Sequence, residues 1–103
     1  MERIGKLKEF LALNPADSFL KHALALEYIK TGDDETAEQL FSEILAAEPS
    51  YVGSYYHLGK LLERKADYDK AMAVYRDGMT HAQLKTDTHS YNELRAALED
   101  IEE

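Results

Sequence analysis

The chain has 103 residues, a hydrophobic fraction of 45%, a charged fraction of 31% and no cysteine. This composition is typical of one globular domain, and it excludes disulfides, thiolate metal sites and a cysteine nucleophile. The formal net charge of −8 disfavours broad nucleic-acid binding, because phosphate backbones repel an acidic surface.

The first segment has a helical pattern that ends at a proline. Its apolar residues recur at helical spacing: Ile4, Leu7, Phe10 and Leu11. The pair Asn14-Pro15 disfavours helical backbone at this point. The pattern therefore predicts an N-terminal helix within residues 1–15.

Two further helices are expected before the next proline. Asp17 is a suitable N-cap for a helix that is expected to end at Thr31-Gly32-Asp33, where Gly32 is free to adopt the left-handed conformation. A third helix is expected from about Asp34 to Glu48-Pro49. The expected packing residues of the two helices are Leu20, Leu24, Tyr28, Ala37, Leu40, Phe41, Ile44 and Leu45.

The same two-helix pattern then occurs again, and a single helix follows it. The second pair is expected over Tyr51 to Lys65 and over Asp67 to about Leu84, and Asp87 is expected to cap a sixth helix. The apolar residues of that last helix are Tyr91, Leu94, Leu98 and Ile101. The sequence contains no strand pattern.

A period of thirty-four residues relates the two pairs. Pro15 and Pro49 stand at this spacing, and the matched positions between them are Leu24 with Leu58, Ala25 with Gly59, Gly32 with Ala66, Ala37 with Ala71, and Phe41 with Tyr75. The period extends back into the first segment, where Leu7, Leu11 and Leu13 match Phe41, Leu45 and Ala47. A fixed period of this length indicates a solenoid in which each unit buries its apolar face against its neighbours.

These residues resemble the tetratricopeptide repeat family. Repeat one, residues 18–51, has the family's signature types at Leu24, Ala25, Tyr28, Gly32, Ala37, Phe41, Ile44 and Pro49. Repeat two, residues 52–84, has them at Leu58, Gly59, Tyr68, Ala71 and Tyr75. The departures are Lys21, Leu62, Gly78 and Gln83, where the family has an aromatic residue, tyrosine, alanine and proline.

The resemblance implies an all-α fold of antiparallel helix hairpins stacked as a short right-handed solenoid of about six helices. Residues 1–103 would form one such domain, with residues 1–15 as a second-helix remnant before the two repeats. The last helix, residues 88–103, fits the repeat only when it is shifted by two residues, so we expect it to cap the array. It is also acidic: the last sixteen residues have five acidic side chains and one arginine, which is half of the net charge. We expect this charge to solvate the helix.

Catalytic and metal-binding patterns are missing from the sequence. The four histidines, His22, His57, His81 and His89, form no i,i+4 pair, and no nucleophile elbow or glycine-rich phosphate loop is present. The acidic run Asp33-Asp34-Glu35 is expected at a helix start, where negative charge is favourable. We therefore expect a protein that is not an enzyme and has no cofactor.

The family resemblance places partner binding on the concave face, which the first helix of each hairpin lines. In repeat one this face would carry Phe19, His22, Leu26, Ile29 and Lys30. In repeat two it would carry Tyr56, Lys60 and Arg64, beside Gly53 and Glu63. Tyr56, Lys60 and Arg64 stand at i, i+4 and i+8, so they form one stripe that is suited to an acidic peptide or a terminal carboxylate.

Two alternatives stay open for this face. Glu63 and nearby acids neutralise Lys60 and Arg64 if the face is only solvated. Phe19, Leu26 and Ile29 either contact Phe10 and the N-terminal helix or form an exposed apolar groove for a helix or peptide. The family's carboxylate-clamp subclass is not indicated, because His22, Leu26 and His57 do not match its basic and asparagine-rich pattern.

The sequence thus favours a non-catalytic module that binds a peptide or helix of another protein. The alternative is a structural module that self-associates as a homo-oligomer through apolar residues of its terminal helices, Ile4 and Leu7 or Tyr91 and Ile101. We expect neither a nucleic-acid nor a membrane partner. No apolar run approaches the roughly 20 residues that span a bilayer, and the first six residues lack the apolar stretch of a secretory signal, so we expect a cytoplasmic location.

Overall fold

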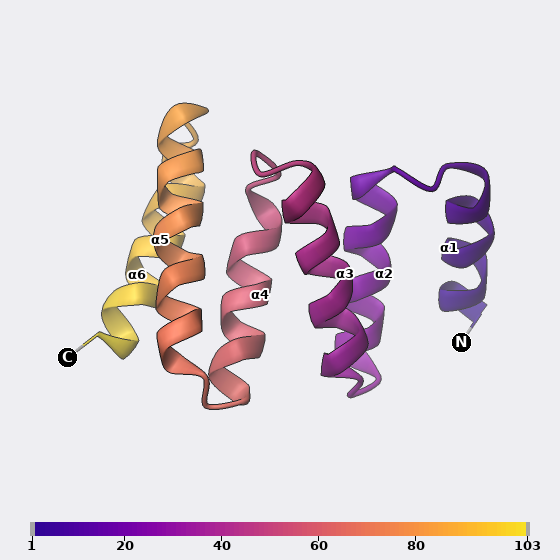
Figure 1. Ribbon diagram of the computed structural model, residues 1–103, viewed down its shortest axis with the longest axis horizontal. Helices are drawn as coiled ribbons and strands as arrows, with labels where there is room; N and C mark the ends of the chain where they lie inside the picture. Colours follow the sequence, from indigo (N-terminus) through magenta and orange to yellow (C-terminus); the bar gives the residue numbers. More distant parts are fainter. Residues whose placement is uncertain (1, 103) are drawn as a thin grey trace. The chain divides into compact units, whose positions relative to one another are not determined.

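The computed structural model describes residues 2–102, and six α-helices account for most of them (Figure 1). The helices are α1 (Glu2–Leu13), α2 (Ser18–Lys30), α3 (Asp34–Ala47), α4 (Gly53–Arg64), α5 (Tyr68–Leu84) and α6 (Thr88–Ile101). No strand occurs between residues 2 and 102. The expected all-α fold of helix hairpins is confirmed, and α4 begins at Gly53, two residues later than the sequence predicts.

Four aspartates cap four of these helices. The side chains of Asp17, Asp33, Asp67 and Asp87 each accept a hydrogen bond from the backbone N–H three residues further on. Asp87 also accepts a hydrogen bond from the Ser90 hydroxyl, and its bonds to Ser90 lower the pKa of its carboxyl. The predicted caps at Asp17 and Asp87 are confirmed, because capping depends on local sequence alone.

The turns before three of these caps share one backbone conformation. Gly32, Ala66 and Thr86 have φ values of 85°, 62° and 52°. In each turn the following aspartate donates its N–H to a carbonyl five residues earlier, at 2.9, 3.0 and 2.8 Å. This is the Schellman arrangement, which satisfies a carbonyl that the helix end leaves free. The left-handed conformation expected for Gly32 is thus confirmed.

Contacts divide the chain into two compact units, one that ends at Glu48 and one that begins at Pro49. In the first unit α2 and α3 form an antiparallel hairpin, and α1 packs on α2 (Figure 1). Its buried apolar residues are Leu7, Leu24, Ala25, Ala37, Phe41 and Ile44.

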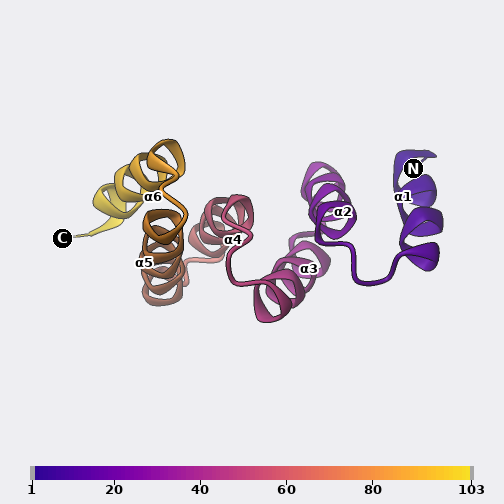
Figure 2. The same ribbon diagram turned by 90° about the horizontal axis from the view of Figure 1, so that it is seen from above.

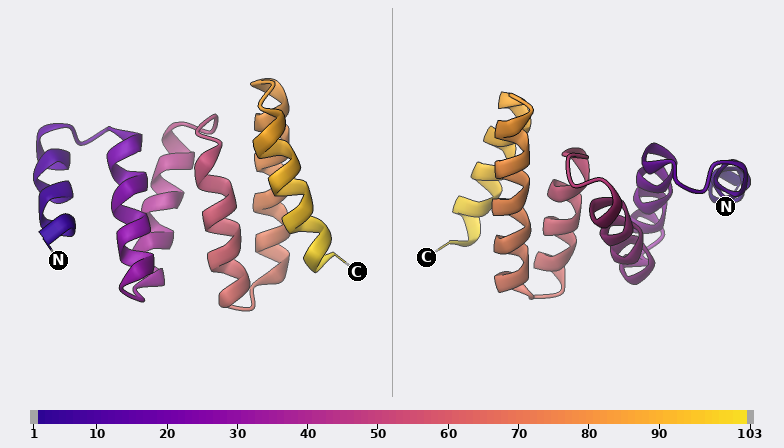
Figure 3. Two further views of the ribbon diagram at one scale, coloured as in Figure 1. Left: turned by 180° about the vertical axis from the view of Figure 1, so that it is seen from behind. Right: turned by 45° about the horizontal axis from the view of Figure 1, so that its top comes forward.

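In the second unit α5 lies between two neighbours in the chain and packs on both α4 and α6. Seen from above, α6 lies beside α5 (Figure 2), and from behind it crosses in front of α5 (Figure 3). The helices α4 and α6 also contact each other. The core residues of this unit come from all three helices: Tyr55, Leu58, Leu61, Leu62, Ala71, Tyr75, Ala82, Leu94, Ala97 and Leu98.

Two glycines allow the helices of this unit to come close. A methyl group at Gly59 would overlap the ring of Tyr75, and one at Gly78 would lie 2.7 Å from Tyr55 Cβ and 2.8 Å from Leu94 Cδ1. Gly78 stands where the family has alanine, and the tight junction of α4, α5 and α6 explains this departure. None of the helices of residues 2–102 is both long and apolar enough to cross a bilayer.

Candidate interaction surface

The residues predicted to bind a partner lie on two helices that belong to different units. The helix α2 in the first unit carries Phe19, His22, Leu26, Ile29 and Lys30, and α4 in the second unit carries Tyr56, Lys60 and Arg64. Both are the first helices of their hairpins, as expected. The contacts of each helix within its own unit show which of these side chains are available.

On α2, one aromatic ring of the predicted set is exposed to solvent. The Phe19 residue is 67% exposed, and Phe10 on α1 is 53% exposed, so α1 does not cover Phe19. Leu26 and Ile29 are half-buried. These three residues leave apolar surface along α2, and covering such surface with a partner lowers the free energy.

His22 has a packing role within the first unit. It is half-buried, and its ring meets the buried ring of Phe41 edge-on, with centroids 5.6 Å apart and an interplanar angle of 67°. This geometry is favourable for aromatic pairs. His22 therefore links α2 to α3, and only its exposed edge is available to a ligand.

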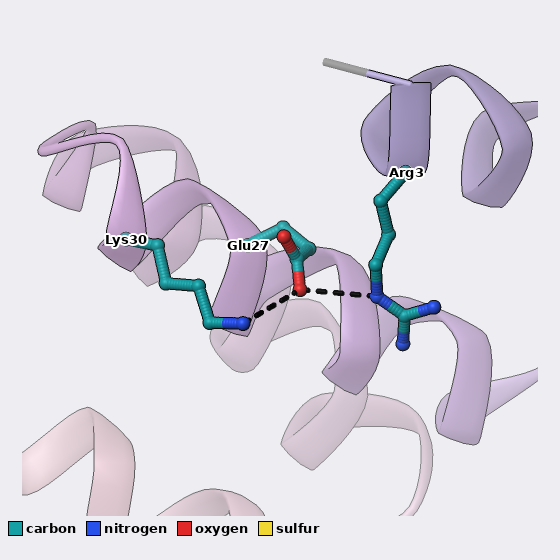
Figure 4. Close-up of polar contacts among 3 residues, drawn as sticks. All are labelled: Arg3, Glu27 and Lys30. Carbon is teal, nitrogen blue, oxygen red and sulfur yellow. Dashed lines mark hydrogen bonds and ion pairs between the residues drawn. The ribbon is translucent and has the colours of Figure 1, made fainter.

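Lys30 is part of a three-residue ion-pair cluster (Figure 4). Its Nζ lies 3.2 Å from Glu27 Oε2, and Arg3 Nε on α1 lies 3.1 Å from the same oxygen. The hydrogen bond from Lys30, followed by that from Arg3, lowers the pKa of the Glu27 carboxyl. Sequence reasoning missed Glu27; the i,i+3 spacing to Lys30 was the available signal, whereas Arg3 is 24 residues away.

On α4, the structure brings Tyr56 and Lys60 together. The Lys60 ammonium lies 5.8 Å from the centroid of the Tyr56 ring, and it is 3.7 Å from Glu63 Oε2. Glu63 thus neutralises Lys60, as the solvated alternative expects. Arg64, one turn further on, is exposed.

Glu63 also connects this surface to the core. Its carboxylate accepts a hydrogen bond from the hydroxyl of Tyr75 on α5. Burial, followed by this bond to Glu63, raises the pKa of the Tyr75 phenol. Because the hydroxyl stays protonated, it holds Glu63 and, through Glu63, the Lys60 ammonium in place.

His57 lies next to this surface and is half-buried. Its ring meets that of Tyr56 edge-on, with centroids 5.7 Å apart. Burial lowers the pKa of His57, and the nearby Glu93 carboxylate on α6 opposes the shift. In the described part of the chain, no group of three or more His, Cys, Asp or Glu side chains is arranged to hold a metal ion.

Comparison with known proteins gives the family. Residues 52–83 match the tetratricopeptide repeat. The crystal structure of a tetratricopeptide repeat domain protein from Salinibacter ruber is 38% identical to this chain, with a TM-score of 0.81, and the match covers 84% of this chain and 96% of that one. This chain belongs to the tetratricopeptide repeat family. The solution structure of such a domain protein from the same organism agrees, with 39% identity, a TM-score of 0.82 and coverage of 85% and 89%.

Curated relatives of this tetratricopeptide repeat chain are much longer than it is. It is 25% identical over 81 residues to the aspartyl/asparaginyl beta-hydroxylase of Mus musculus, of which it spans 11%. It is 26% identical over 71 residues to the interferon-induced protein with tetratricopeptide repeats 3 of Mus musculus, of which it spans 18%. The tetratricopeptide repeat domain family in general mediates protein–protein interactions and is in general not catalytic.

Proposed function

We propose that this tetratricopeptide repeat chain is a non-catalytic module that binds a peptide or helix of a partner protein. The contact residues are those predicted on the first helices of the two hairpins: Phe19, His22, Leu26, Ile29, Lys30, Tyr56, Lys60 and Arg64. The observation that carries the proposal is the exposed ring of Phe19 on the same helix as the partly exposed Leu26 and Ile29. Exposed aromatic and aliphatic groups of this kind supply most of the affinity for peptide ligands.

The polar residues of the set have a secondary role. Lys30 and Lys60 already have internal carboxylate partners in Glu27 and Glu63, so a ligand gains little by approaching them with a carboxylate alone. The ring of Tyr56 and the aliphatic part of Lys60 offer packing area instead. We therefore expect a partner segment whose affinity comes mainly from apolar side chains.

Peptide binding tests this proposal. An array of random peptides identifies ligands of the unaltered protein, and calorimetry then measures them against two variants, Phe19→Ala and the triple change Tyr56→Ala with Lys60→Ala and Arg64→Ala. We expect each variant to lose about tenfold or more in affinity, which corresponds to about 1.4 kcal/mol. The matched control is Tyr68→Ala, since Tyr68 is a 49% exposed tyrosine on the second helix α5.

Two results would contradict the proposal. Peptides that bind both variants as tightly as the unaltered protein, or that lose affinity only with Tyr68→Ala, show that the ligand lies elsewhere. Circular dichroism checks that each variant keeps its helices.

Self-association through the terminal helices has less support. Leu7 is buried within the first unit, and Ile4, Tyr91 and Ile101 are half-buried. The homo-oligomer therefore stays a prediction from the sequence, as does the cytoplasmic location. Light scattering that shows a larger assembly at working concentrations would favour self-association.

A further inference from the structure

We infer that Arg3 on α1 and Arg95 on α6 keep copies of this chain apart, by blocking a contact in which α6 of one copy pairs with α1 of another. The inference is independent of the peptide-binding proposal.

The helix α6 has the burial pattern of a first helix. Its buried residues repeat those of α4 at an offset of 36 residues: Leu58 with Leu94, Leu61 with Ala97, and Leu62 with Leu98. The helix α1 has instead the sequence register of a second helix, at an offset of 34 residues from α3. Its buried Leu7 matches the buried Phe41 of α3, whereas Phe10, which matches the buried Ile44, is 53% exposed.

In the hairpins of this chain, first and second helices pair through small residues. Ala25 on α2 and Gly59 on α4 are fully or nearly fully buried at equivalent positions, and at Gly59 even a methyl group would overlap Tyr75 of the partner helix. On the second helices, Ala37 and Ala71 have no exposed surface. A hairpin of this type therefore needs small side chains on both sides.

The helices α1 and α6 carry arginine at these two positions. Arg95 stands 36 residues after Gly59, and Arg3 stands 34 residues before Ala37. Their side chains are 53% and 64% exposed, and they approach Glu99 at 4.0 Å and Glu27 at 3.1 Å. Both guanidinium groups are thus in solvent beside a carboxylate of their own copy.

Without the two arginines, α6 and α1 of different copies would complement each other. In register they are a first helix and a second helix, the two kinds that pair in a hairpin. With the arginines present, close pairing would take two cations out of water. It would also have to accommodate two long side chains at the positions where the hairpins of this chain have Gly59 and Ala37.

Sedimentation velocity tests the inference with four proteins. These are the unaltered chain, Arg3→Ala, Arg95→Ala and the double variant. We expect the first three to be monomeric and the double variant to form assemblies that grow with concentration, with a dissociation constant at least tenfold lower than that of the unaltered chain. The two substituted side chains are exposed, so helicity should be retained, and Arg3→Gln with Arg95→Gln is a second pair that preserves helix propensity.

A mixture of the two single variants identifies the contact. The Arg95→Ala copy offers an unblocked α6, and the Arg3→Ala copy offers an unblocked α1, so the mixture should form a one-to-one complex that neither variant forms alone. The control double variant, Lys6→Ala with Arg76→Ala, also removes two positive charges and should behave as the unaltered chain does.

Three results would overturn the inference. In the first, the double variant stays as monomeric as the unaltered chain. In the second, the unaltered chain already associates through α1 and α6. In the third, the control associates as strongly as the double variant, which would assign the effect to net charge.

Discussion

The ring of Tyr75 on α5 lies so close to the backbone of Gly59 on α4 that position 59 has no room for a side chain. Both residues are buried, and they stand at the centre of the second helix hairpin. The equivalent pair in the first hairpin is Ala25 and Phe41, a slightly larger residue opposite a ring without a hydroxyl. The extra hydroxyl of Tyr75 donates a hydrogen bond to Glu63, so this buried ring also positions a carboxylate near the surface.

Gly59→Ala should therefore destabilise the protein. Alanine has the higher helix propensity by about 1 kcal/mol, but overpacking a well-filled core typically costs about 1–3 kcal/mol. We expect the free energy of unfolding, measured with urea, to fall. The matched control is Gly5→Ala on α1, where a methyl group would meet nothing within 4 Å; this change should leave stability equal or slightly higher. Equal stability of both variants would show that the Tyr75 ring can move away at little cost.

The turn residues Gly32 and Ala66 allow a reciprocal exchange. Both have positive φ, at 85° and 62°, but only Gly32 avoids the steric cost of a β-carbon there. Gly32→Ala should lower the free energy of unfolding by about 1 kcal/mol, because left-handed backbone costs an L-residue about 1–2 kcal/mol and the smaller entropy loss of alanine on folding, about 0.4–1 kcal/mol, offsets part of this cost. Ala66→Gly should raise it by a similar amount, since the same two effects act in the opposite direction. Thermal unfolding of both variants measures the two effects, and changes of the same sign would contradict this explanation.

His57 should make stability depend on pH below neutrality. Burial lowers its pKa in the folded protein below the ordinary value of 6.5, so the unfolded chain binds a proton at a higher pH than the folded one does. Stability should therefore fall as the pH decreases through 6.5 towards the lower folded pKa, and it should be unaffected by His57 well above pH 7. Urea titrations at several pH values measure this slope. In His57→Gln the slope between pH 7 and 5 should be smaller, and an unchanged slope would remove His57 as its cause.

Helix limits could be predicted from the sequence because their causes are local. An aspartate cap acts on the N–H three residues further on, and a glycine at a helix end acts on its own backbone. Asp17, Asp87 and Gly32 accordingly behave as predicted. The start of α4 was predicted two residues early, because Val52, the residue before it, has helical backbone and no side chain that caps.

The candidate surface could be predicted only in part from the sequence. Helical spacing places Phe19, Leu26 and Ile29 on a second face of α2, but it does not tell whether α1 covers them. Phe10 has the same periodicity as the buried Leu7, yet it is 53% exposed because α1 has neighbours on one side only in the first unit. Exposure depends on what lies opposite a residue, and a single helix does not contain that information.

By itself, the sequence determined the helices, their caps, the thirty-four-residue repeat and the family, because each of these follows from short-range chemistry or from a period along the chain. Only the tertiary structure decided that Phe19 is exposed, that Glu27 holds Arg3 as well as Lys30, and that Tyr75 holds Glu63 beside Lys60. These relationships join residues on different helices or depend on the neighbours of a face. Their distances are set by how helices pack, and packing is determined by the shapes of all the side chains together.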